Sequence, residues 1–272
     1  FDLDDPMGTS TCVGCGECVQ ACPTGALMPS KEVGQVEPDK KVDSVCPYCG
    51  VGCLLTYNIK DDKILFAEGR DGPANMSRLC VKGRYGFNYV NSDQRLTVPL
   101  ARKKGVSKDI NPEDFDLNKI ENYFEPISWD EAIKRTTEKF KSLVMSDSRS
   151  TAGFGCAKGS NEEAYLFQKL VRTGFRNNNV DHCTRLCHAS SVVALLEMIG
   201  SGAVSNQVAD VAEAETIIVI GANPTVNHPV AATFIKNAAK AGKNLIVLDP
   251  RKNDLARHAT HYLQFKPDTD VA

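Results

Sequence analysis

The chain has 272 residues, of which 42% are hydrophobic and 24% charged, an ordinary balance for a globular protein long enough to form two or three domains. The formal net charge is −2, and no basic stripe with interleaved aromatics stands out, so we expect no nucleic-acid partner. No apolar run approaches the roughly 18–20 residues needed to span a bilayer, so we expect no membrane span in this chain.

Cysteine is the unusual component. The chain has 11 cysteines, most of them in its first third and only two or three residues apart. Disulfide frameworks belong mainly to small secreted chains, whereas close spacing is typical of metal ligands. The pattern therefore predicts metal centres and a reducing, cytoplasmic setting.

The first motif is "CVGCGECVQACP", which contains Cys12, Cys15, Cys18 and Cys22. Ferredoxin-type domains hold [4Fe–4S] clusters with this spacing. In two-cluster ferredoxins the fourth cysteine of such a run binds the other cluster. This pattern leaves it open whether Cys22 serves a cluster whose other ligands lie before Phe1, and whether the cluster of Cys12, Cys15 and Cys18 takes its fourth ligand from there. Structural zinc or free thiols are the alternative to a cluster.

Residues 29–43 are polar and contain two prolines, which is typical of a linker. Two alternating runs over residues 54–69 then predict a β-hairpin around Asp61 and Asp62. Four cysteines frame this hairpin and predict a second [4Fe–4S] cluster, with zinc as the alternative: Cys46, Cys49, Cys53 and Cys80.

Residues 101–126 are polar and irregular, and from Ser128 the pattern changes to that of an α/β domain. Capping boxes predict two helices, one beginning at Ser128 with Glu131 and one at Ser160 with Glu163. The short stretch "TAGFGCA" between them predicts a strand broken by glycine.

Further along, a buried strand over 216–220, a helix over 228–242 and a strand over 244–248 form a βαβ unit. The predicted fold class is α/β, with an α+β iron–sulfur part. We expect a ferredoxin-like segment and linker (1–40), a small four-cysteine domain (41–100) and a Rossmann-like parallel-sheet cofactor-binding region (101–272). The last is expected to be incomplete at its carboxyl end, since the chain reads as a piece of a longer protein.

Six motifs occur in one order: "CPYCGVGC", "RLCVKGRYG", "SWDEAI", "GSNEEAYLFQKLVRTGFRNNNVDHCTRLCHASSVVAL", "IGANPTVNHPVAA" and "VLDPRKNDLARHA". Together they resemble the catalytic subunits of molybdenum- or tungsten-dependent formate dehydrogenases, in the bis-pyranopterin (dimethyl sulfoxide reductase) superfamily. The resemblance covers roughly residues 44–272, and the segment before it is similar to the extension of cytoplasmic, multi-cluster members. It implies at least two [4Fe–4S] clusters and a Mo or W bis-molybdopterin guanine dinucleotide.

The resemblance implies that Cys187 ligates the molybdenum or tungsten. A helix predicted over 189–199 places Cys187 just before a helix start, which favours a thiolate, and a soft thiolate suits such a metal. His188 is then a candidate proton acceptor. Lys82, by the same resemblance, lies between the four-cysteine cluster and the pterin. Cys156 and Cys183 are expected to be packing residues.

Polar residues that follow the strands of the βαβ unit predict a cofactor cradle, because ligands bind at such strand ends. The motif is not GxGxxG, so a simple NAD site fits poorly. The residues that we expect to contact the cofactor's nucleotide arms, most of them implied by the resemblance, are Gly221, Asn223, Asp249 and Arg251, with Ser160 and Asn161 at a helix start, and Asp270.

The resemblance implies interconversion of formate and CO2, with electrons passed to NADH dehydrogenase-like, ferredoxin-linked or hydrogenase iron–sulfur subunits. In related nitrate reductases the resemblance implies a Cys-Met pair at the position where this chain has Cys187 and His188. Formylmethanofuran dehydrogenases share a pair similar to that of this chain, so they remain an alternative function. An alternative of another class is an electron-transfer subunit without an active site, as in respiratory complex I. The arginine that holds formate in the family is expected after Ala272, so these 272 residues alone are predicted to be inactive.

Overall fold

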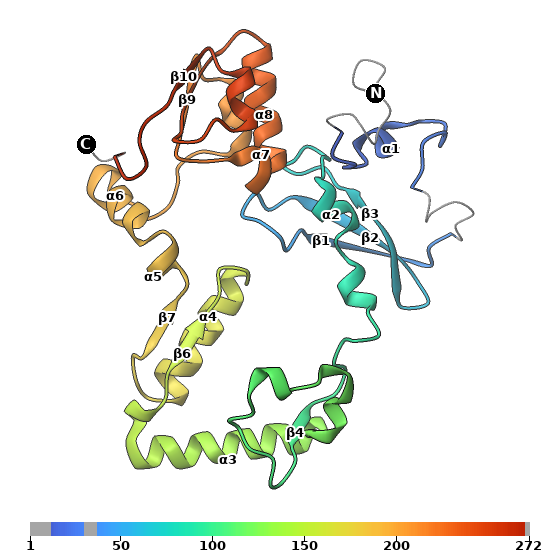
Figure 1. Cartoon of the computed structure of the whole chain (residues 1–272), viewed down its shortest axis with the longest axis vertical. Helices are drawn as coiled ribbons and strands as arrows, with labels where there is room; N and C mark the ends of the chain where they lie inside the picture. Colours follow the sequence, from blue (N-terminus) through green and yellow to red (C-terminus); the bar gives the residue numbers. More distant parts are fainter. Residues whose placement is uncertain (1–11, 30–36, 270–272) are drawn as a thin grey trace. The chain divides into compact units, whose positions relative to one another are not determined.

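A computed structural model of the chain describes residues 12–29 and 37–269 (Figure 1). The chain forms two compact units. Unit 1 combines residues 1–93 with residues 204–272, and unit 2 consists of residues 94–203. The predicted α/β class, with its parallel sheets, is confirmed.

Unit 1 begins with the short helix α1 (Glu17–Ala21) and an antiparallel sheet of β1 (Lys40–Val45), β2 (Leu54–Lys60) and β3 (Lys63–Gly69). The predicted hairpin is confirmed, and its turn residues Asp61 and Asp62 have positive φ angles of 48° and 57°.

The predicted linker is wrong at its carboxyl end, because residues 40–43 belong to β1. This strand pairs with β2 from Lys40 opposite Ile59 to Val45 opposite Leu54. It is an edge strand and largely exposed, so its polar sequence carries the composition of a linker although its backbone is paired.

After the sheet come helix α2 (Val81–Tyr85) and the 3-10 turn η3 (Asn88–Asn91). The predicted βαβ unit follows as β8 (Thr216–Ile220), α8 (Pro229–Lys240) and β9 (Asn244–Leu248), with the short helix α7 (Pro224–Asn227) before α8. A third strand, β10 (His261–Leu263), extends the parallel sheet in the order β10-β9-β8. The 3-10 turns η8 (Val208–Ala212) and η9 (Asp254–His258) complete this part.

The expectation that residues 216–220 are buried is correct for one face only. Ile217 and Val219 pack in a core with Ala238 of α8, whereas Ile218 and Ile220 are exposed. The apolar run gives no alternation of hydrophobic and polar residues, so its sequence does not reveal that only one face is covered.

A second core joins the four-cysteine domain to α8 within unit 1. Its buried members are Cys46, Val51, Cys53, Leu55, Leu79, Val230 and Phe234. The cysteines predicted to bind a cluster are therefore packed against the helix of the βαβ unit.

Unit 2 contains two small sheets and three longer helices. β4 (Leu100–Arg102) pairs with β5 (Phe124–Pro126), so the stretch predicted to be irregular is paired at both ends. Between them lie the 3-10 turns η4 (Pro112–Asp114) and η5 (Leu117–Asn122).

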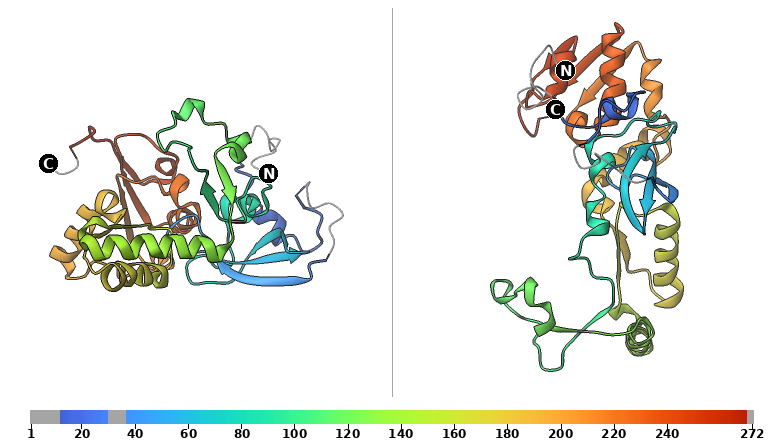
Figure 2. Two further views of the ribbon diagram at one scale, coloured as in Figure 1. Left: turned by 90° about the horizontal axis from the view of Figure 1, so that it is seen from below. Right: turned by 90° about the vertical axis from the view of Figure 1, so that its right-hand side faces the viewer.

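The long helix α3 (Trp129–Asp147) follows, yellow-green in Figure 2, and the 3-10 turn η6 (Ser148–Ser150) ends it. Its predicted start is confirmed, because the Ser128 hydroxyl accepts a hydrogen bond from the Glu131 N–H. The Glu131 carboxylate does not complete the capping box and bonds Arg135 instead.

The rest of unit 2 runs β6 (Gly153–Gly155), α4 (Asn161–Lys169), the π-helical turn η7 (Leu170–Gly174), β7 (Val180–His182), α5 (Thr184–Cys187) and α6 (Ala189–Ile199). β6 and β7 are parallel. The capping box of Ser160 and Glu163 is confirmed in both of its hydrogen bonds. Of the helices in the described ranges, none combines the length and the apolarity that crossing a bilayer requires.

Candidate functional site

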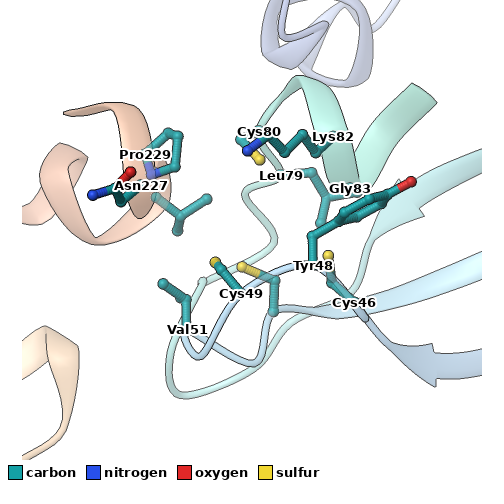
Figure 3. A pocket seen from close by; sticks show the side chains of 12 residues that line it. Cys46, Tyr48, Cys49, Val51, Leu79, Cys80, Lys82, Gly83, Asn227 and Pro229 are labelled. Atoms are coloured by element: carbon teal, nitrogen blue, oxygen red, sulfur yellow. The ribbon is translucent and has the colours of Figure 1, made fainter. Parts of the chain in front are cut away.

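All four cysteines predicted to hold the second cluster line one pocket of unit 1 (Figure 3). Lys82 lines the same pocket. The other lining residues are Tyr48, Val51, Leu79 and Gly83 from the four-cysteine domain, and Asn227, Pro229 and Val230 from α7 and α8. Figure 3 shows Cys80 and Lys82 on one side of the pocket and Cys46 and Cys49 on the other.

The loop between β1 and β2 carries three of these cysteines. Its two ends are joined by a hydrogen bond of 2.9 Å from the Cys46 N–H to the Cys53 carbonyl. Inside the loop, Gly52 adopts a φ of 69° and donates to the Cys49 carbonyl. A left-handed conformation costs glycine little, so the chain can turn back within a few residues.

Asn75 connects the segment of Cys80, the fourth cysteine, to the loop that carries the other three. This role of Asn75 was not predicted from the sequence. This side chain is fully buried, and its amide bonds both the N–H and the carbonyl of Leu54, next to Cys53. It also donates to the carbonyl of Arg78, two residues before Cys80. A single asparagine in a loop has no spacing signal that could have identified it.

The electrostatics of the pocket reflect four thiols close together. Burial, followed by the charges of Cys46, Cys49 and Cys80, raises the pKa of the Cys53 thiol to about 12. Thiolates in such a place need a nearby cation, which the iron of a cluster supplies. Four sulfurs around one pocket suit the four corners of a [4Fe–4S] cluster, so the residues fit that group.

Within residues 12–29 and 37–269, no group of three or more His, Cys, Asp or Glu side chains is placed to hold a single metal ion. No disulfide joins the cysteines, all of which lie in these ranges.

The ferredoxin-type cysteines lie on and around α1. Gly14 and Gly16, with φ angles of 61° and 75°, shape the loop before the helix. The Gly14 N–H donates to the Cys12 sulfur at 3.4 Å. Hydrogen bonds, first from the Thr24 hydroxyl and then from backbone groups, lower the pKa of Cys22 to about 6, which favours the thiolate that a metal requires.

The structure also brings the predicted cradle residues together. One pocket at the carboxyl ends of β8 and β9 is lined by Gly221, Asn223, Asp249 and Arg251. Gly221 has a φ of 60°, and its N–H donates to the Leu248 carbonyl at 2.9 Å, which holds the two strand ends together. The pocket therefore has the position, at parallel strand ends, where open α/β sheets bind ligands.

Two further asparagines belong to this region and were not predicted. Asn253 is buried and donates to the Ala222 carbonyl and to the Asp249 carboxylate, both at 3.3 Å. Asn227, at the end of α7, lines both the cradle and the four-cysteine pocket. It stands within the quoted motif "IGANPTVNHPVAA", which is the only sequence signal that could have singled it out.

Ser160 and Asn161 lie in unit 2, and neither lines the cradle. The Ser160 hydroxyl accepts from the Glu163 N–H at 3.2 Å, so it already caps α4. Asp270 lies outside the described residues. The contacts of these three residues with a nucleotide stay predictions.

Cys187 is exposed and is the last residue of the short helix α5. The predicted helix over 189–199 is confirmed as α6, and its N-cap residue is His188. The Cys187 N–H donates to the Cys183 carbonyl at 3.0 Å. Cys187 thus lies just before α6, as predicted, and is also the last residue of a second short helix, which was not predicted.

Family models match almost the whole chain. Residues 95–272 match the molybdopterin oxidoreductase model, and residues 39–92 match the molybdopterin oxidoreductase Fe4S4 domain. Residues 8–28 match a 4Fe-4S binding domain. The iron–sulfur and molybdopterin cofactors expected from the sequence are therefore those of the matched family.

Two relatives carry the name "Putative formate dehydrogenase" and come from Staphylococcus aureus strains MRSA252 and bovine RF122 / ET3-1. Each is 33% identical over the full length of this chain, and the chain spans 30% of each relative. Among solved structures, acetylene hydratase from Pelobacter acetylenicus matches with a TM-score of 0.66 and 20% identity, covering 82% of this chain and 29% of that one. This last likeness shows the fold alone.

Proposed function

The chain belongs to the molybdopterin oxidoreductase family, and we propose that it works as part of the catalytic subunit of a formate dehydrogenase. The reaction is HCOO⁻ ⇌ CO₂ + H⁺ + 2 e⁻. The observation that carries the choice of formate is the pair Cys187 and His188, at the junction of α5 and α6. The names of the 33% identical relatives agree with it.

In this proposal Cys187 supplies a thiolate ligand to molybdenum or tungsten, and its exposed side chain leaves the sulfur accessible to a cofactor. His188, the next residue, accepts the proton that formate releases, at a ring nitrogen. The molybdopterin, when bound, would supply a metal able to take up two electrons. Gly221, Asn223, Asp249 and Arg251 would hold one of its guanine nucleotide arms; Ser160, Asn161 and Asp270 stay candidate contacts elsewhere.

The electrons would leave through the four-cysteine pocket. Lys82 lines this pocket, and its ammonium group would stabilise the additional negative charge of a reduced cluster. From the four-cysteine pocket the electrons would pass to the ferredoxin-type cysteines. They would then pass to an iron–sulfur, NADH dehydrogenase-like or hydrogenase partner subunit. We propose a cytoplasmic location, where reducing conditions preserve thiolate ligands.

The test uses the full-length subunit. We expect iron together with molybdenum or tungsten in the purified protein, and formate-dependent reduction of a viologen dye. Cys187→Ala should abolish this activity while the iron content stays the same, because the cluster cysteines are untouched. His188→Gln should retain the metal and lower kcat by about 100-fold or more, the usual contribution of a proton acceptor.

The outcomes separate the alternatives that the sequence left open. A full-length protein without molybdenum or tungsten would overturn the proposal in favour of an electron-transfer subunit. A metal-loaded protein that reduces nitrate or oxidises formylmethanofuran, but not formate, would retain the family and overturn the substrate.

A further inference from the structure

Helix α2 presents its residues to two different neighbours. Cys80, at its N-cap, and Lys82 line the four-cysteine pocket. Arg84, two residues further on, contacts the ferredoxin-type loop instead and is only 5% exposed. One short helix therefore touches both sets of predicted cluster ligands.

The Arg84 guanidinium makes three hydrogen bonds to the ferredoxin-type segment. Its Nε donates to the carbonyl of Cys15 at 2.8 Å, so it bonds a predicted cluster ligand directly. Its Nη1 donates to Gln20 Oε1 at 2.8 Å, and its Nη2 to Glu17 Oε1 at 2.5 Å. A buried guanidinium that loses such partners is left as an uncompensated charge, which is strongly destabilising.

The two acceptors are themselves bonded to the four-cysteine domain. Glu17 Oε1 also accepts from the N–H of Leu79, the residue before Cys80, at 2.8 Å. The Gln20 side chain exchanges hydrogen bonds with the backbone of Gly69, at 2.8 and 3.0 Å, and donates to the Ser77 carbonyl at 3.2 Å. These bonds attach α1 to the last residue of β3 and to the segment just before Cys80.

Close backbone approach at the same contact leaves no room for larger residues. A Cβ atom on Gly16 would clash with the Tyr85 hydroxyl and the Arg84 side chain. A Cβ atom on Gly69 would clash with the backbone of Ser77. The contact is therefore specific in shape as well as in its hydrogen bonds.

We propose that Arg84, Gln20 and Glu17 form a latch that fixes the ferredoxin-type loop against α2 and so sets the spacing between the two iron–sulfur clusters. Arg84 is a positioning residue, which acts through the Cys15 backbone on one side and through Cys80 on its own helix on the other. Its importance for turnover rests on the proposed electron path, since transfer between clusters depends on their separation. The latch itself rests only on the contacts around Arg84.

The test measures magnetic coupling between the two clusters by EPR in the fully reduced, full-length holoprotein. In Arg84→Gln we expect the iron content and the EPR signal of each cluster to persist. The splitting or broadening that one cluster causes in the EPR signal of the other should be lost. Arg84→Lys should not restore the coupling, because one ammonium group cannot make the three-way planar contact. Lys63→Gln, which removes a positive charge from an exposed position on β3, is the matched control and should keep the coupling.

Unchanged coupling in Arg84→Gln would overturn the latch. If that variant loses iron, Gln20→Ala decides, because Gln20 is exposed and uncharged, and Arg84 keeps its bonds to the Cys15 carbonyl and the Glu17 carboxylate without it. Lost coupling in Gln20→Ala supports the latch, and retained coupling overturns it. Neither reading uses formate, so a failed latch is distinguishable from a failed formate activity.

Discussion

Asn75 shows how one uncharged side chain can organise a loop that carries predicted cluster ligands. Its amide nitrogen is shared among the carbonyls of Leu54, Arg70 and Arg78, at 3.0–3.1 Å, and its oxygen accepts from the Leu54 N–H at 3.0 Å. The spacing of the cysteines predicts the ligands, because ligand geometry constrains spacing directly. It does not predict Asn75 or Arg84, since a residue that bonds distant backbone leaves no periodic or spaced trace in the sequence.

We predict that Asn75→Ala lowers the free energy of unfolding by about 2–4 kcal/mol, because several buried backbone groups lose their partner. It should also reduce the iron bound at the four-cysteine pocket. Chemical denaturation with iron analysis measures both. Asn91→Ala is the matched control, since Asn91 also bonds one residue's N–H and carbonyl, those of Ile64, but at an exposed site; it should cost less than about 1 kcal/mol. Equal losses in the two variants would contradict the role given to burial.

At the scale of elements, the strongly patterned segments follow from the sequence. The β2–β3 hairpin, α3, α4 and the β8–α8–β9 unit all have clear alternation, caps or apolar runs. Short elements were missed, among them β1, β10 and α5. Three to six residues form too short a window for periodicity, and these elements depend on a neighbouring strand or helix rather than on local propensity.

The hairpin turn allows a prediction with a definite sign. Asp61 and Asp62 both have positive φ, and the second position of such a turn prefers glycine. Asp62→Gly should therefore raise the free energy of unfolding, by up to about 1 kcal/mol. Asp71→Gly, at an exposed position without positive φ, should lower it through the greater entropy of the unfolded chain. Thermal unfolding of the two variants checks the opposite signs, and two shifts in one direction would refute this account of the turn.

Helix α8 supports the cysteine pocket as well as the parallel sheet. Phe234 is buried in the core that contains Cys46 and Cys53, so Phe234→Ala should lower the free energy of unfolding by about 3–5 kcal/mol. The iron content should fall with it. Asn237→Ala, on the exposed side of the same helix, should change stability by less than about 1 kcal/mol. Calorimetry and iron analysis of the pair test whether α8 is part of the iron–sulfur domain, and a stable, iron-replete Phe234→Ala would show that it is not.

At the scale of the whole molecule, the compact units do not follow the chain's linear order. Unit 1 is formed by the first and the last segment of the chain, because α8 of the last segment packs on the four-cysteine domain of the first. In the sequence, unit 2 is inserted between these two segments. The predicted division into three consecutive domains stays a prediction about sequence segments. Linear reading cannot reveal the insertion, because the contact between Val230 and the cysteines spans more than 140 residues of chain and has no local signature.

This insertion predicts that unit 1 assembles the proposed iron site at its four-cysteine pocket without unit 2. We expect a chain in which a flexible Gly/Ser linker replaces residues 94–203 to bind as much iron at Cys46, Cys49, Cys53 and Cys80 as the intact chain, because every residue that lines their pocket belongs to unit 1. A chain of residues 1–93 alone should bind less, since it lacks Asn227, Pro229 and Val230 from the pocket wall. Iron analysis and EPR of the two chains after anaerobic reconstitution provide the comparison. Equal iron in both would show that α7 and α8 are dispensable for the cluster, whereas loss of iron from the linked chain would show that unit 2 is needed to form the site.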